Sequence, residues 1–408
     1  MLAPAIRLYR HSFSGLSRDI WLLSLVMLVN RAGTMVIPFL TIYLTGQKGF
    51  RLEEAGWVMS SFGLGSVLGA FIGGKLTDRI GYYPVQFWSL MLGGFCFLGL
   101  QFVSGVAAMC VAAFILSTIA DAFRPANQTA VAFHSRPENR SRAFALVRLA
   151  VNLGFSAGPV MGGLIAHAAG YHWLFVVDAV TCFGAALIFR FSISPKKAAR
   201  RSETVLEKGL SPWKDGQFLK FILFITLGAL AFMQFMNTLP IFWKTSYGFT
   251  EAQIGALTTL NGLIIVSMEM PMTYLIERKL TKLAIIGIGT IFYGIAYFTL
   301  SGLSYWALTP ILFMIFLTIG EMLCMPFASA YTADQAHPTR RGQYMGVYSM
   351  AYSAALIIGP SLSLWMAQVY GFIPLWVVCG GLSAVSAVGI LLLRRASTGR
   401  PVAEASMH

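Results

Sequence analysis

Twelve apolar stretches run through the chain, and each is long enough to cross a membrane as an α-helix. About 20 residues suffice, because a helix rises ~1.5 Å per residue and the hydrocarbon core is ~30 Å thick. With 57% hydrophobic and 11% charged residues, the composition indicates a polytopic membrane protein. The sequence therefore predicts an all-α fold of twelve membrane-spanning helices. The stretches are residues 21–45, 55–76, 85–104, 106–129, 143–168, 172–192, 217–244, 252–275, 281–303, 305–329, 342–369 and 373–394.

Lysine and arginine are distributed unevenly among the connections between these stretches. The N-terminal segment, the even-numbered connections and the central loop hold most of them, whereas the odd-numbered connections hold only Lys48, Arg51 and Lys244. By the positive-inside rule, we expect both termini and the central loop in the cytoplasm, with the chain in the inner (plasma) membrane. The net charge of +14 is then mainly an orientation signal, and its spread over many loops argues against nucleic-acid binding.

One pattern of residues occurs twice, about 200 positions apart. Each copy places a carboxylate inside an apolar stretch: Asp121 in residues 117–125 (STIADAFRP) and Glu321 in residues 317–326 (LTIGEMLCMP). Internal duplication combined with charge inside the membrane is typical of secondary transporters.

The duplication predicts two six-helix bundles related by a pseudo-two-fold axis along the membrane normal. A polar, basic stretch divides them and is expected to be a cytoplasmic linker. The predicted units are residues 1–192 for the first bundle, 193–216 for the linker, and 217–408 for the second bundle with a short cytoplasmic tail.

Between the second and third stretches the chain reads Gly74-Lys-Leu-Thr-Asp78-Arg79-Ile-Gly81. This segment resembles the Gly-x-x-x-Asp-Arg-x-Gly signature of the major facilitator superfamily, and the resemblance extends over essentially the whole chain. Its glycines permit a tight turn, while Asp78 and Arg79 lie at the cytoplasmic mouth, where they can bind helix ends or charges of the other half. A plain charged turn is the alternative interpretation.

The segment also departs from the family pattern. The basic residues that the family usually places after the second glycine are Tyr82, Tyr83 and Pro84 here. We therefore expect Arg79 to carry more of any latch at this mouth.

The fifth stretch contains Gly154-x-x-x-Gly158-Pro159-x-x-Gly162-Gly163. This pattern is similar to the antiporter motif of the drug:proton antiporters in the same superfamily, and that resemblance implies export. Glycines four residues apart line one helix face and allow another helix to approach closely. The face is expected either to seal or slide at the interface between the halves or to serve ordinary helix packing.

A charge inside the membrane costs at least ~2.5–3.5 kcal/mol at a helix centre unless it is paired or hydrated. Arg31, preceded by Asn30, lies about twelve residues into the first span, which is near mid-bilayer. Asp178 in the sixth span lies at similar depth. Either the two form a structural ion pair, or Arg31 lines a cavity and receives an anionic group of the substrate.

The fourth and fifth spans hold a second set of charges. Asp121 is expected to pair with Arg124 or with Arg148, and the resemblance implies a functional arginine at Arg124. In the second half, Cys324 and Ser349 stand at the positions of Arg124 and Arg148.

Glu321 therefore lacks the arginines that surround its counterpart Asp121. A buried carboxylate without a partner is disfavoured in its charged form, which suits a proton carrier. Glu269 in the eighth span is a second acid without an evident partner. We rank Glu321 first as the proton-coupling residue, with Glu269 and Asp121 next.

Further polar side chains lie in helices that the superfamily turns toward its central path, and with Asn30 and Arg31 they are expected to line a substrate cavity. Each could instead make a helix–helix hydrogen bond. The 19 methionines and 31 phenylalanines would give this cavity an adaptable wall that suits amphipathic substrates. The residues are Asn152, Gln234, Asn237, Asn261, Tyr348 and Tyr352.

These features predict a proton-coupled secondary transporter that exports small amphipathic compounds or drugs by alternating access. Small-molecule substrates, protons and the lipid bilayer are the expected partners; we expect a monomer with no cofactor and no metal. The alternatives are a proton symporter importing an organic anion or peptide, a lipid or lysolipid translocator, and a non-transporting receptor on the same scaffold. An enzyme is not expected, because no nucleophile–base set, phosphate loop or metal cluster is evident.

Overall fold

A computed structural model describes residues 2–194, 209–303 and 307–398 of the chain. These residues form α-helices and three short 3-10 helices, and no strand occurs among them. Within this part of the chain, 12 spans are long and apolar enough to cross a membrane. The predicted all-α fold with twelve membrane-spanning helices is therefore confirmed.

The spans follow one another with short connections. The first six are α2 (Arg18–Ala32) with α3 (Val36–Gly46), α4 (Leu52–Ile80), α5 (Tyr82–Leu100), α6 (Val106–His134), α7 (Arg140–Ala169) and α8 (His172–Ser192). The second six are α10 (Gly216–Asn237) with α11 (Leu239–Ser246), α12 (Glu251–Ile276), α13 (Lys282–Gly302), α14 (Thr309–Gln335), α15 (Arg341–Tyr370) and α16 (Phe372–Thr398). The short helices η1 (Pro137–Asn139), η2 (Pro212–Lys214) and η3 (Pro338–Arg340) precede α7, α10 and α15.

Two predicted ranges do not coincide with the elements of the structure. The tenth span begins at Thr309 and ends at Gln335, later than the predicted 305–329. Its start suits Pro310, which occupies the first turn, where its missing N–H costs no helical hydrogen bond. Of the predicted linker at 193–216, residues 195–208 lie outside the described residues.

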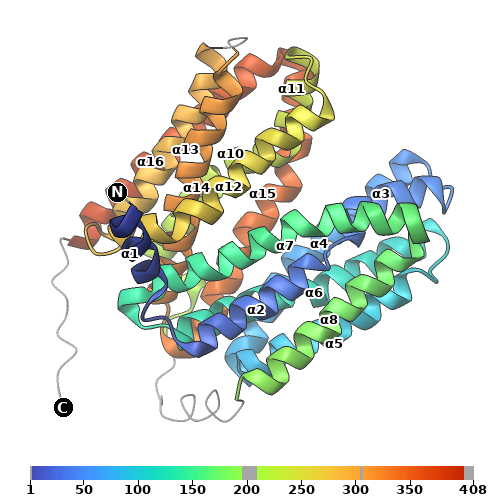
Figure 1. Ribbon diagram of the computed structural model, residues 1–408, viewed down its shortest axis with the longest axis horizontal. Coiled ribbons are helices and arrows are strands. Elements are labelled where there is room, and N and C mark those ends of the chain that lie inside the picture. The colour runs from blue at the N-terminus through green and yellow to red at the C-terminus, as the bar shows by residue number, and fades with distance from the viewer. Residues whose placement is uncertain (1, 195–208, 304–306, 399–408) are drawn as a thin grey trace.

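The spans are arranged as two bundles, α2–α8 and α10–α16 (Figure 1). In the first bundle α6 packs on α4 and α5; in the second, α13 packs on α14 and α16. The halves meet where α15 crosses α4 and α6 and where α7 crosses α12 and α14. Large side chains such as Trp243, Tyr297 and Trp376 fill the interior of the second bundle, where close packing stabilises helices that lipid surrounds.

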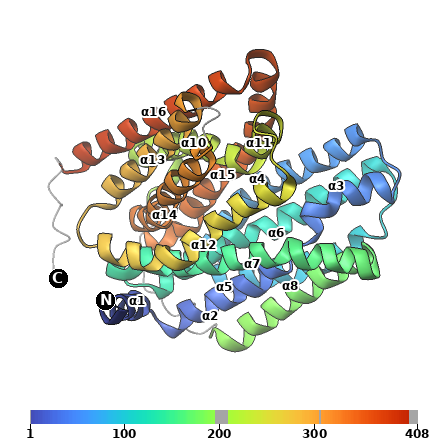
Figure 2. The same cartoon turned by 45° about the horizontal axis from the view of Figure 1, so that its top comes forward.

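One end of the molecule, which we call the basic end, carries most of the described cationic turns. It is formed by α1 (Leu2–Phe13) and by the turns that follow α6, α12 and α14, and the end of α16 lies there as well (Figures 1 and 2). Its cationic side chains include Arg140, Arg142, Arg278, Lys282 and Arg340.

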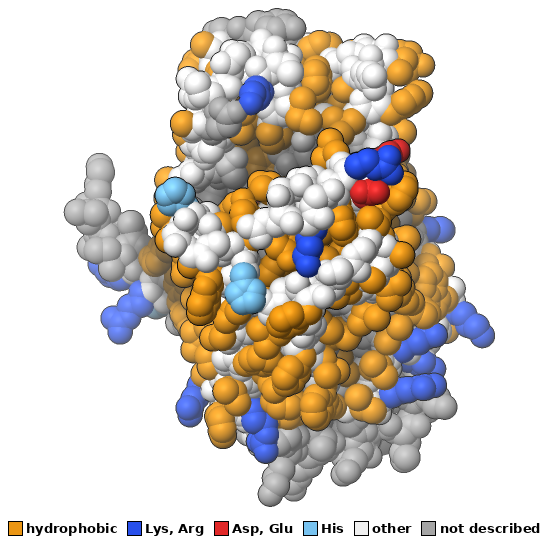
Figure 3. Space-filling model, turned by 90° about the vertical axis from the view of Figure 1, so that its right-hand side faces the viewer, with side chains coloured by type: hydrophobic (Ala, Val, Ile, Leu, Met, Phe, Trp, Pro, Cys, Tyr) orange, Lys and Arg blue, Asp and Glu red, His pale blue; other side chains and the backbone are white. Residues whose placement is uncertain are grey.

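At the opposite end the two halves diverge. There, α3 contacts α4, α7 and α8, whereas α11 contacts α10 and α12, so each stays with its own half (Figure 1). Figure 3 shows this end face on: few Lys or Arg side chains appear on it, and the surface is hollowed between the two halves. The molecule is therefore closed at the basic end and open at the other.

The first and seventh spans are each interrupted, where the sequence predicted continuous helices over 21–45 and 217–244. The breaks follow Ala32 and Asn237 and come just before Pro38 and Pro240. A proline has no N–H with which to continue the preceding helix but fits the first turn of a new one. The prediction of unbroken helices is therefore wrong at these two points.

The helix α1 was not anticipated from the sequence, and it connects the two halves at the basic end. The hydroxyl of Tyr9 donates to the carbonyl oxygen of Val266 on α12, at 3.2 Å. The amide of Asn139 donates to the carbonyl oxygen of Gly15, at 2.7 Å, and so fixes the turn after α1. The chain's first helix thus lies against a span of the second bundle.

Glycines bring α4 and α15 into backbone contact where they cross near the basic end. A Cβ added at Gly74 would lie 2.6 Å from the carbonyl oxygen of Gly342, and one at Gly346 would lie 2.8 Å from that of Ala70. Real Cβ atoms essentially never approach a carbonyl oxygen so closely. The closed arrangement at the basic end therefore requires these glycines.

Replacing Gly74 by Val should push α4 and α15 apart and open the basic end, because the added methyl groups cannot fit against Gly342. Spin labels at the exposed positions Glu138 and Lys279, one in each half, measure the separation by double electron–electron resonance. We expect a longer distance in the variant than in the wild type.

The control is Gly56→Val on the same helix, where an added Cβ meets no atom within 4 Å. Both variants are compared after Cys96 and Cys110, the two cysteines that are not fully buried, are changed to Ser. An unchanged distance in Gly74→Val, or an equal change in Gly56→Val, would show that the glycine crossing does not hold this end closed.

Candidate functional site

Three charged side chains from both halves meet where α7 crosses α12 and α14. Arg148 donates from Nε to Oε1 of Glu269 at 2.6 Å and from Nη1 to Oε1 of Glu321 at 2.8 Å. The side chains are 13%, 0% and 8% exposed in that order. We call Arg148, Glu269 and Glu321 the interhalf charge cluster. Their pairing offsets the cost of holding charges inside a membrane.

The interhalf charge cluster is not fully satisfied. Asn261 donates from Nδ2 to Oε2 of Glu321 and to the hydroxyl of Thr318, both at 2.9 Å. However, Oε2 of Glu269 and Nη2 of Arg148 are buried and have no hydrogen-bond partner among the described residues. With both acids ionised, one arginine against two carboxylates leaves a formal charge of −1. A single proton would neutralise the cluster.

The sequence interpretation of the two acids is wrong in one respect. It treated Glu321 and Glu269 as acids without partners, but both bind Arg148 of the other half. At the equivalent positions within the second half, Cys324 and Ser349 offer no positive charge. The actual partner approaches from the opposite bundle.

Asp121 pairs with Arg124, one of its two expected partners, at 3.6 Å, and Arg148 does not bind it. The guanidinium of Arg124 also donates across the interface to the hydroxyl of Ser353 on α15, at 3.0 Å. That hydroxyl lies 3.1 Å from the hydroxyl of Ser66. This set therefore belongs to the contact between the halves at α4, α6 and α15.

Asp178 does not form an ion pair with Arg31, which corrects the structural alternative for these residues. Its carboxylate accepts hydrogen bonds from the backbone N–H groups of Met35, at 2.9 and 3.3 Å, and of Val36, at 3.0 Å. These are the donors exposed at the start of α3 by the break in the first span. Asp178 thus caps a helix, and Arg31 lies over the ring of Phe155 instead, at 5.3 Å.

The glycine face of α7 packs within its own half. A Cβ at Gly154 would lie 2.6 Å from the Cβ of Arg31, and one at Gly158 would lie 3.1 Å from the carbonyl oxygen of Thr34. The expectation that this face seals or slides between the halves is therefore wrong. The motif instead lets α2 and α3 pass closely at the break in the first span. Gly162 and Gly163 continue this face against Phe39.

Asp78 joins the two halves at the basic end. Its carboxylate accepts hydrogen bonds from the backbone N–H groups of Gly342 at 2.6 Å and Gln343 at 3.0 Å, at the start of α15. A helix start offers free N–H groups and partial positive charge, both of which favour a carboxylate. Arg79, expected to carry more of this latch, is exposed and makes no ion pair among the described residues. Gly81, with φ +84°, ends α4.

The equivalent acid of the second half, Glu277, makes the reciprocal contact. It accepts a hydrogen bond from Nε of Arg142 at the start of α7, at 2.5 Å. Arg142 also donates to the carbonyl oxygen of Ser14 after α1, at 3.0 Å. Burial raises the pKa of the Glu277 carboxyl above its ordinary value, and Arg142 opposes that shift.

A third ionic contact closes the basic end. Asp334 at the end of α14 pairs with Arg140 of the first half and with Lys282 of its own half. Arg140 belongs to the basic even-numbered connections, and no partner was predicted for Asp334. The sequence signal for this contact was an acidic residue at the end of a span, close to basic turns.

Of the remaining residues predicted to line a cavity, one contacts the interhalf charge cluster and the others lie elsewhere in the helices. Gln234 and Asn237 donate to carbonyl oxygens of their own helix, at 2.9 Å each. Tyr348 and Tyr352 contact each other through their hydroxyls at 3.4 Å. Nδ2 of Asn152 is buried without a hydrogen-bond partner among the described residues. Only Asn261 of this set reaches the interhalf charge cluster.

In the described part of the chain, no group of three or more His, Cys, Asp or Glu side chains is placed to hold a metal ion. The groups that the structure brings together are instead arginines with carboxylates and hydroxyls. Of these groups the carboxylates can exchange protons, and all of them can hydrogen-bond a polar ligand.

The family model described as "Major Facilitator Superfamily" matches residues 21–313 and 222–407 of the chain. A Bacillus subtilis protein named as an uncharacterized MFS-type transporter, YqjV, is 27% identical, with 81% of each chain covered. A Na(+), Li(+), K(+)/H(+) antiporter of Planococcus maritimus is 23% identical over 88% of this chain and 91% of its own. Multidrug resistance protein MdtH of Aeromonas salmonicida is 25% identical, with 80% and 82% covered.

The fold has counterparts among solved structures. A bacterial homologue of the iron transporter ferroportin, solved in an outward-facing state, superposes with a TM-score of 0.73. The match covers 93% of this chain and 100% of that one, at 18% sequence identity. This likeness concerns the fold alone.

Asp78→Ala should open the basic end, because it leaves the N–H groups of Gly342 and Gln343 without the carboxylate that joins the halves. Each unsatisfied donor costs about 1–3 kcal/mol unless water reaches it, which favours separation of the halves. The distance between spin labels at Glu138 and Lys279 should lengthen.

Asp215→Ala provides a matched control, since that carboxylate also caps a helix start, accepting from Gln217 and Phe218, but within one half. It should lower the melting temperature without changing the label distance. Equal distance changes in both variants would contradict a joining role for Asp78.

Proposed function

The chain belongs to the Major Facilitator Superfamily, and on that premise we propose that it is a proton-coupled secondary transporter that exports small amphipathic compounds by alternating access. The observation that carries the proposal is the interhalf charge cluster. It holds one formal negative charge in excess, in a buried position, at the contact that must separate when the basic end opens.

The orientation follows from charge. Cationic side chains gather at the basic end, and by the positive-inside rule this supports a cytoplasmic location for that end. The conformation described above is then outward-facing, closed toward the cytoplasm by the contacts of Asp78, Arg140, Arg142 and Arg148 with the second half.

Opening toward the cytoplasm requires Arg148 to leave Glu269 and Glu321. Two carboxylates left without their cation in a poorly hydrated site would strongly favour uptake of a proton. Protonation from the outer side, while the site is outward-facing, weakens the hold on Arg148 and lowers the cost of opening. Release of the proton to the cytoplasm restores the pair and returns the transporter to the outward-facing state.

This order of events couples proton entry to substrate exit. A proton bound outside permits inward opening, substrate then binds from the cytoplasm, and proton loss with reclosure carries the substrate outward. Two relatives bear names consistent with this direction, a multidrug resistance protein and a cation/H(+) antiporter.

Import of an organic anion together with protons is the second candidate function. Arg31 favours it, because it forms no ion pair with a described carboxylate, and a guanidinium in that position suits an anionic ligand. The direction of flux in an imposed pH gradient separates the two: acid on the side opposite the substrate drives accumulation only in antiport.

Purified protein in proteoliposomes tests the coupling with ethidium and norfloxacin as fluorescent amphipathic probes. For one proton exchanged per electroneutral cycle, a gradient of about one pH unit supports about tenfold accumulation, because one unit corresponds to ~1.4 kcal/mol. Flux that is the same with and without the gradient refutes proton coupling. Absence of flux for both probes refutes export of such compounds.

Glu269→Gln and Glu321→Gln should each abolish gradient-driven accumulation while leaving exchange of substrate across the membrane intact, because the amide mimics a permanently protonated acid. The spin-label distance between Glu138 and Lys279 should lengthen at low pH in the wild type. In the variants it should be long already at neutral pH.

Glu54→Gln is the control, since Glu54 pairs with the neighbouring Arg51 within one half. It should keep both the accumulation and the pH dependence of the distance. Wild-type behaviour in both cluster variants would show that the proton binds elsewhere.

A further inference from the structure

Helix α1 lies beside a membrane span and not beyond its end. With 26 residues, α12 is about 39 Å long, close to the thickness of a bilayer with its headgroups. Tyr9 donates to the carbonyl oxygen of Val266, which is ten residues before Ile276, where α12 ends. Figures 1 and 2 both show α1 next to α12 at the edge of the basic end. The helix is therefore at the depth where lipid headgroups meet the hydrocarbon core.

Three aromatic side chains lie at the same depth and connect α1 to the start of α2. The ring centroids of Tyr9 and Phe13 are 5.2 Å apart, and those of Phe13 and Trp21 are 5.8 Å apart. Tyr9 and Trp21 are 41% and 45% exposed. Tyrosine and tryptophan are enriched at membrane–water interfaces, because their rings are apolar and their tips are polar. This row of rings therefore supports an interfacial position for α1.

The two faces of α1 differ in charge and in burial. Arg7, Arg10 and His11 are three and four residues apart, so they share one face of the helix, and all three are exposed. Ser12 lies on the opposite face and is fully buried, with its hydroxyl donating to the carbonyl oxygen of Leu8 at 2.8 Å. One side of α1 thus packs on the protein and the other faces away from it. We call Arg7, Arg10 and His11 the cationic face of α1.

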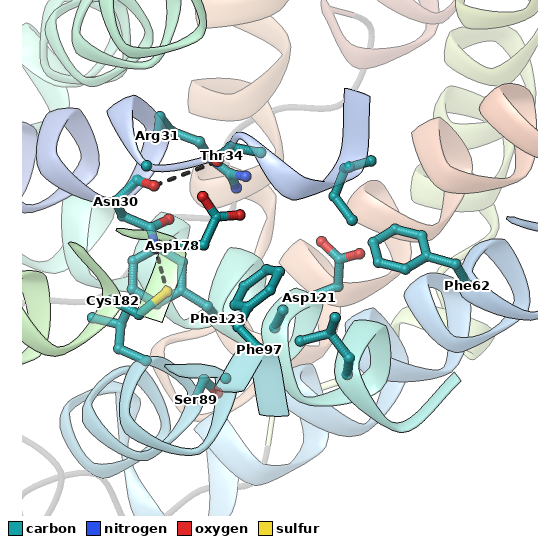
Figure 4. Close-up of a pocket in the computed structure, with 16 residues that line it drawn as sticks. Asn30, Arg31, Thr34, Phe62, Ser89, Phe97, Asp121, Phe123, Asp178 and Cys182 are labelled. Carbon is teal, nitrogen blue, oxygen red and sulfur yellow. Dashed lines mark hydrogen bonds between the residues drawn. The ribbon is translucent and has the colours of Figure 1, made fainter. Parts of the chain in front are cut away.

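The protein supplies no acid to the cationic face of α1 in the part of the chain that the structure describes. Residues 1–18 include no Asp or Glu, and the two arginines of this face form no ion pair among the described residues. The buried arginines are different. Arg148 is paired with two acids, and Arg31 lines an interior cavity together with the carboxylates of Asp121 and Asp178 (Figure 4). The cationic face of α1 is therefore available to an anion from outside the chain.

We propose that the cationic face of α1 binds the phosphate groups of anionic phospholipids. The charges are complementary, and at this depth an arginine can lay its carbon chain along lipid while its guanidinium reaches a phosphate. A signal for membrane orientation requires only that cations be on one side of the membrane. It does not require them to share one face of a helix that lies along a span. The inference does not depend on proton coupling or on the direction of transport.

The test measures lipid binding to the purified full-length protein in micelles of an uncharged detergent. Palmitoyl-oleoyl phosphatidylglycerol and palmitoyl-oleoyl phosphatidylcholine have the same acyl chains and differ in net charge, and each is titrated at constant ionic strength. We expect phosphatidylglycerol, but not phosphatidylcholine, to raise the melting temperature in a saturable way, as a ligand of the native state does. Equal responses to the two lipids, or none to phosphatidylglycerol, would overturn the proposal.

Two further titrations identify the source of the negative charge. Glycerol 3-phosphate carries the phosphate without acyl chains, and poly-glutamate carries the carboxylates of an acidic protein. Neither should raise the melting temperature. A response to glycerol 3-phosphate as large as that to phosphatidylglycerol would assign the face to a soluble phosphate compound. A response to poly-glutamate alone would assign it to an acidic protein, and either result would overturn the proposal.

Paired substitutions locate the lipid. Arg7→Gln combined with Arg10→Gln should weaken phosphatidylglycerol binding by roughly thirtyfold, because each basic residue near an anionic surface contributes about fivefold. Arg278→Gln combined with Lys279→Gln is the control, since it removes two exposed charges from the turn after α12 at the same end. This control should bind phosphatidylglycerol nearly like the wild type. Equal weakening in the two double variants would show that the overall charge of the basic end, and not α1, attracts the lipid.

Arg7→Lys combined with Arg10→Lys covers the case in which the glutamine variant disturbs the packing of α1. It keeps both charges, and an ammonium group also binds phosphate, so phosphatidylglycerol should bind within a few fold of the wild type. A loss as large as that in the glutamine variant would show that charge on α1 does not hold the lipid, and would overturn the proposal.

Discussion

Arg148 bound to Glu269 and Glu321 is the interaction on which the arrangement of the two halves depends. A cation from one bundle satisfies two acids of the other, so neither bundle can bury its charges alone. The three charges are stable inside a membrane only while the halves are together, because separation leaves unpaired ions in a site of low polarity. We therefore propose that closure at the basic end and the charge state of the acids are linked.

The contacts between the halves occur at equivalent positions of the duplicated sequence, but the groups that make them differ. Asp78 and Glu277 occupy equivalent positions, and each reaches the start of the fifth span of the opposite bundle. One binds backbone N–H groups and the other binds a guanidinium. At the position of Arg148, the second half has Ser349, which contacts Gln128 across the interface. The contacts of Asp78 and Glu277 are thus nearly symmetric between the halves. The interhalf charge cluster, by contrast, occurs on only one side of the pseudo-two-fold axis.

The sequence predicted the helices well because apolar length is a local property. It did not predict the breaks in the first and seventh spans, although Pro38 and Pro240 marked both of them. The charged residues were found for the same reason as the spans, since an ion in an apolar stretch is conspicuous. Their partners were not: an ion pair between Asp178 and Arg31 was one of two alternatives, and Asp178 instead caps α3.

The sequence by itself determined the twelve spans, the duplication, the charge asymmetry and which acids and arginines lie within the membrane. Only the tertiary structure decided that Arg148 joins Glu269 and Glu321 and that the glycine face of α7 packs on the first span. It also decided that Arg31 faces a cavity without an ion pair among the described residues. Hydropathy and residue spacing are local properties of consecutive residues, so they can be read directly from the sequence. An ion pair between the bundles depends on which helices cross and at what depth, and only the packing of the two bundles against each other sets both.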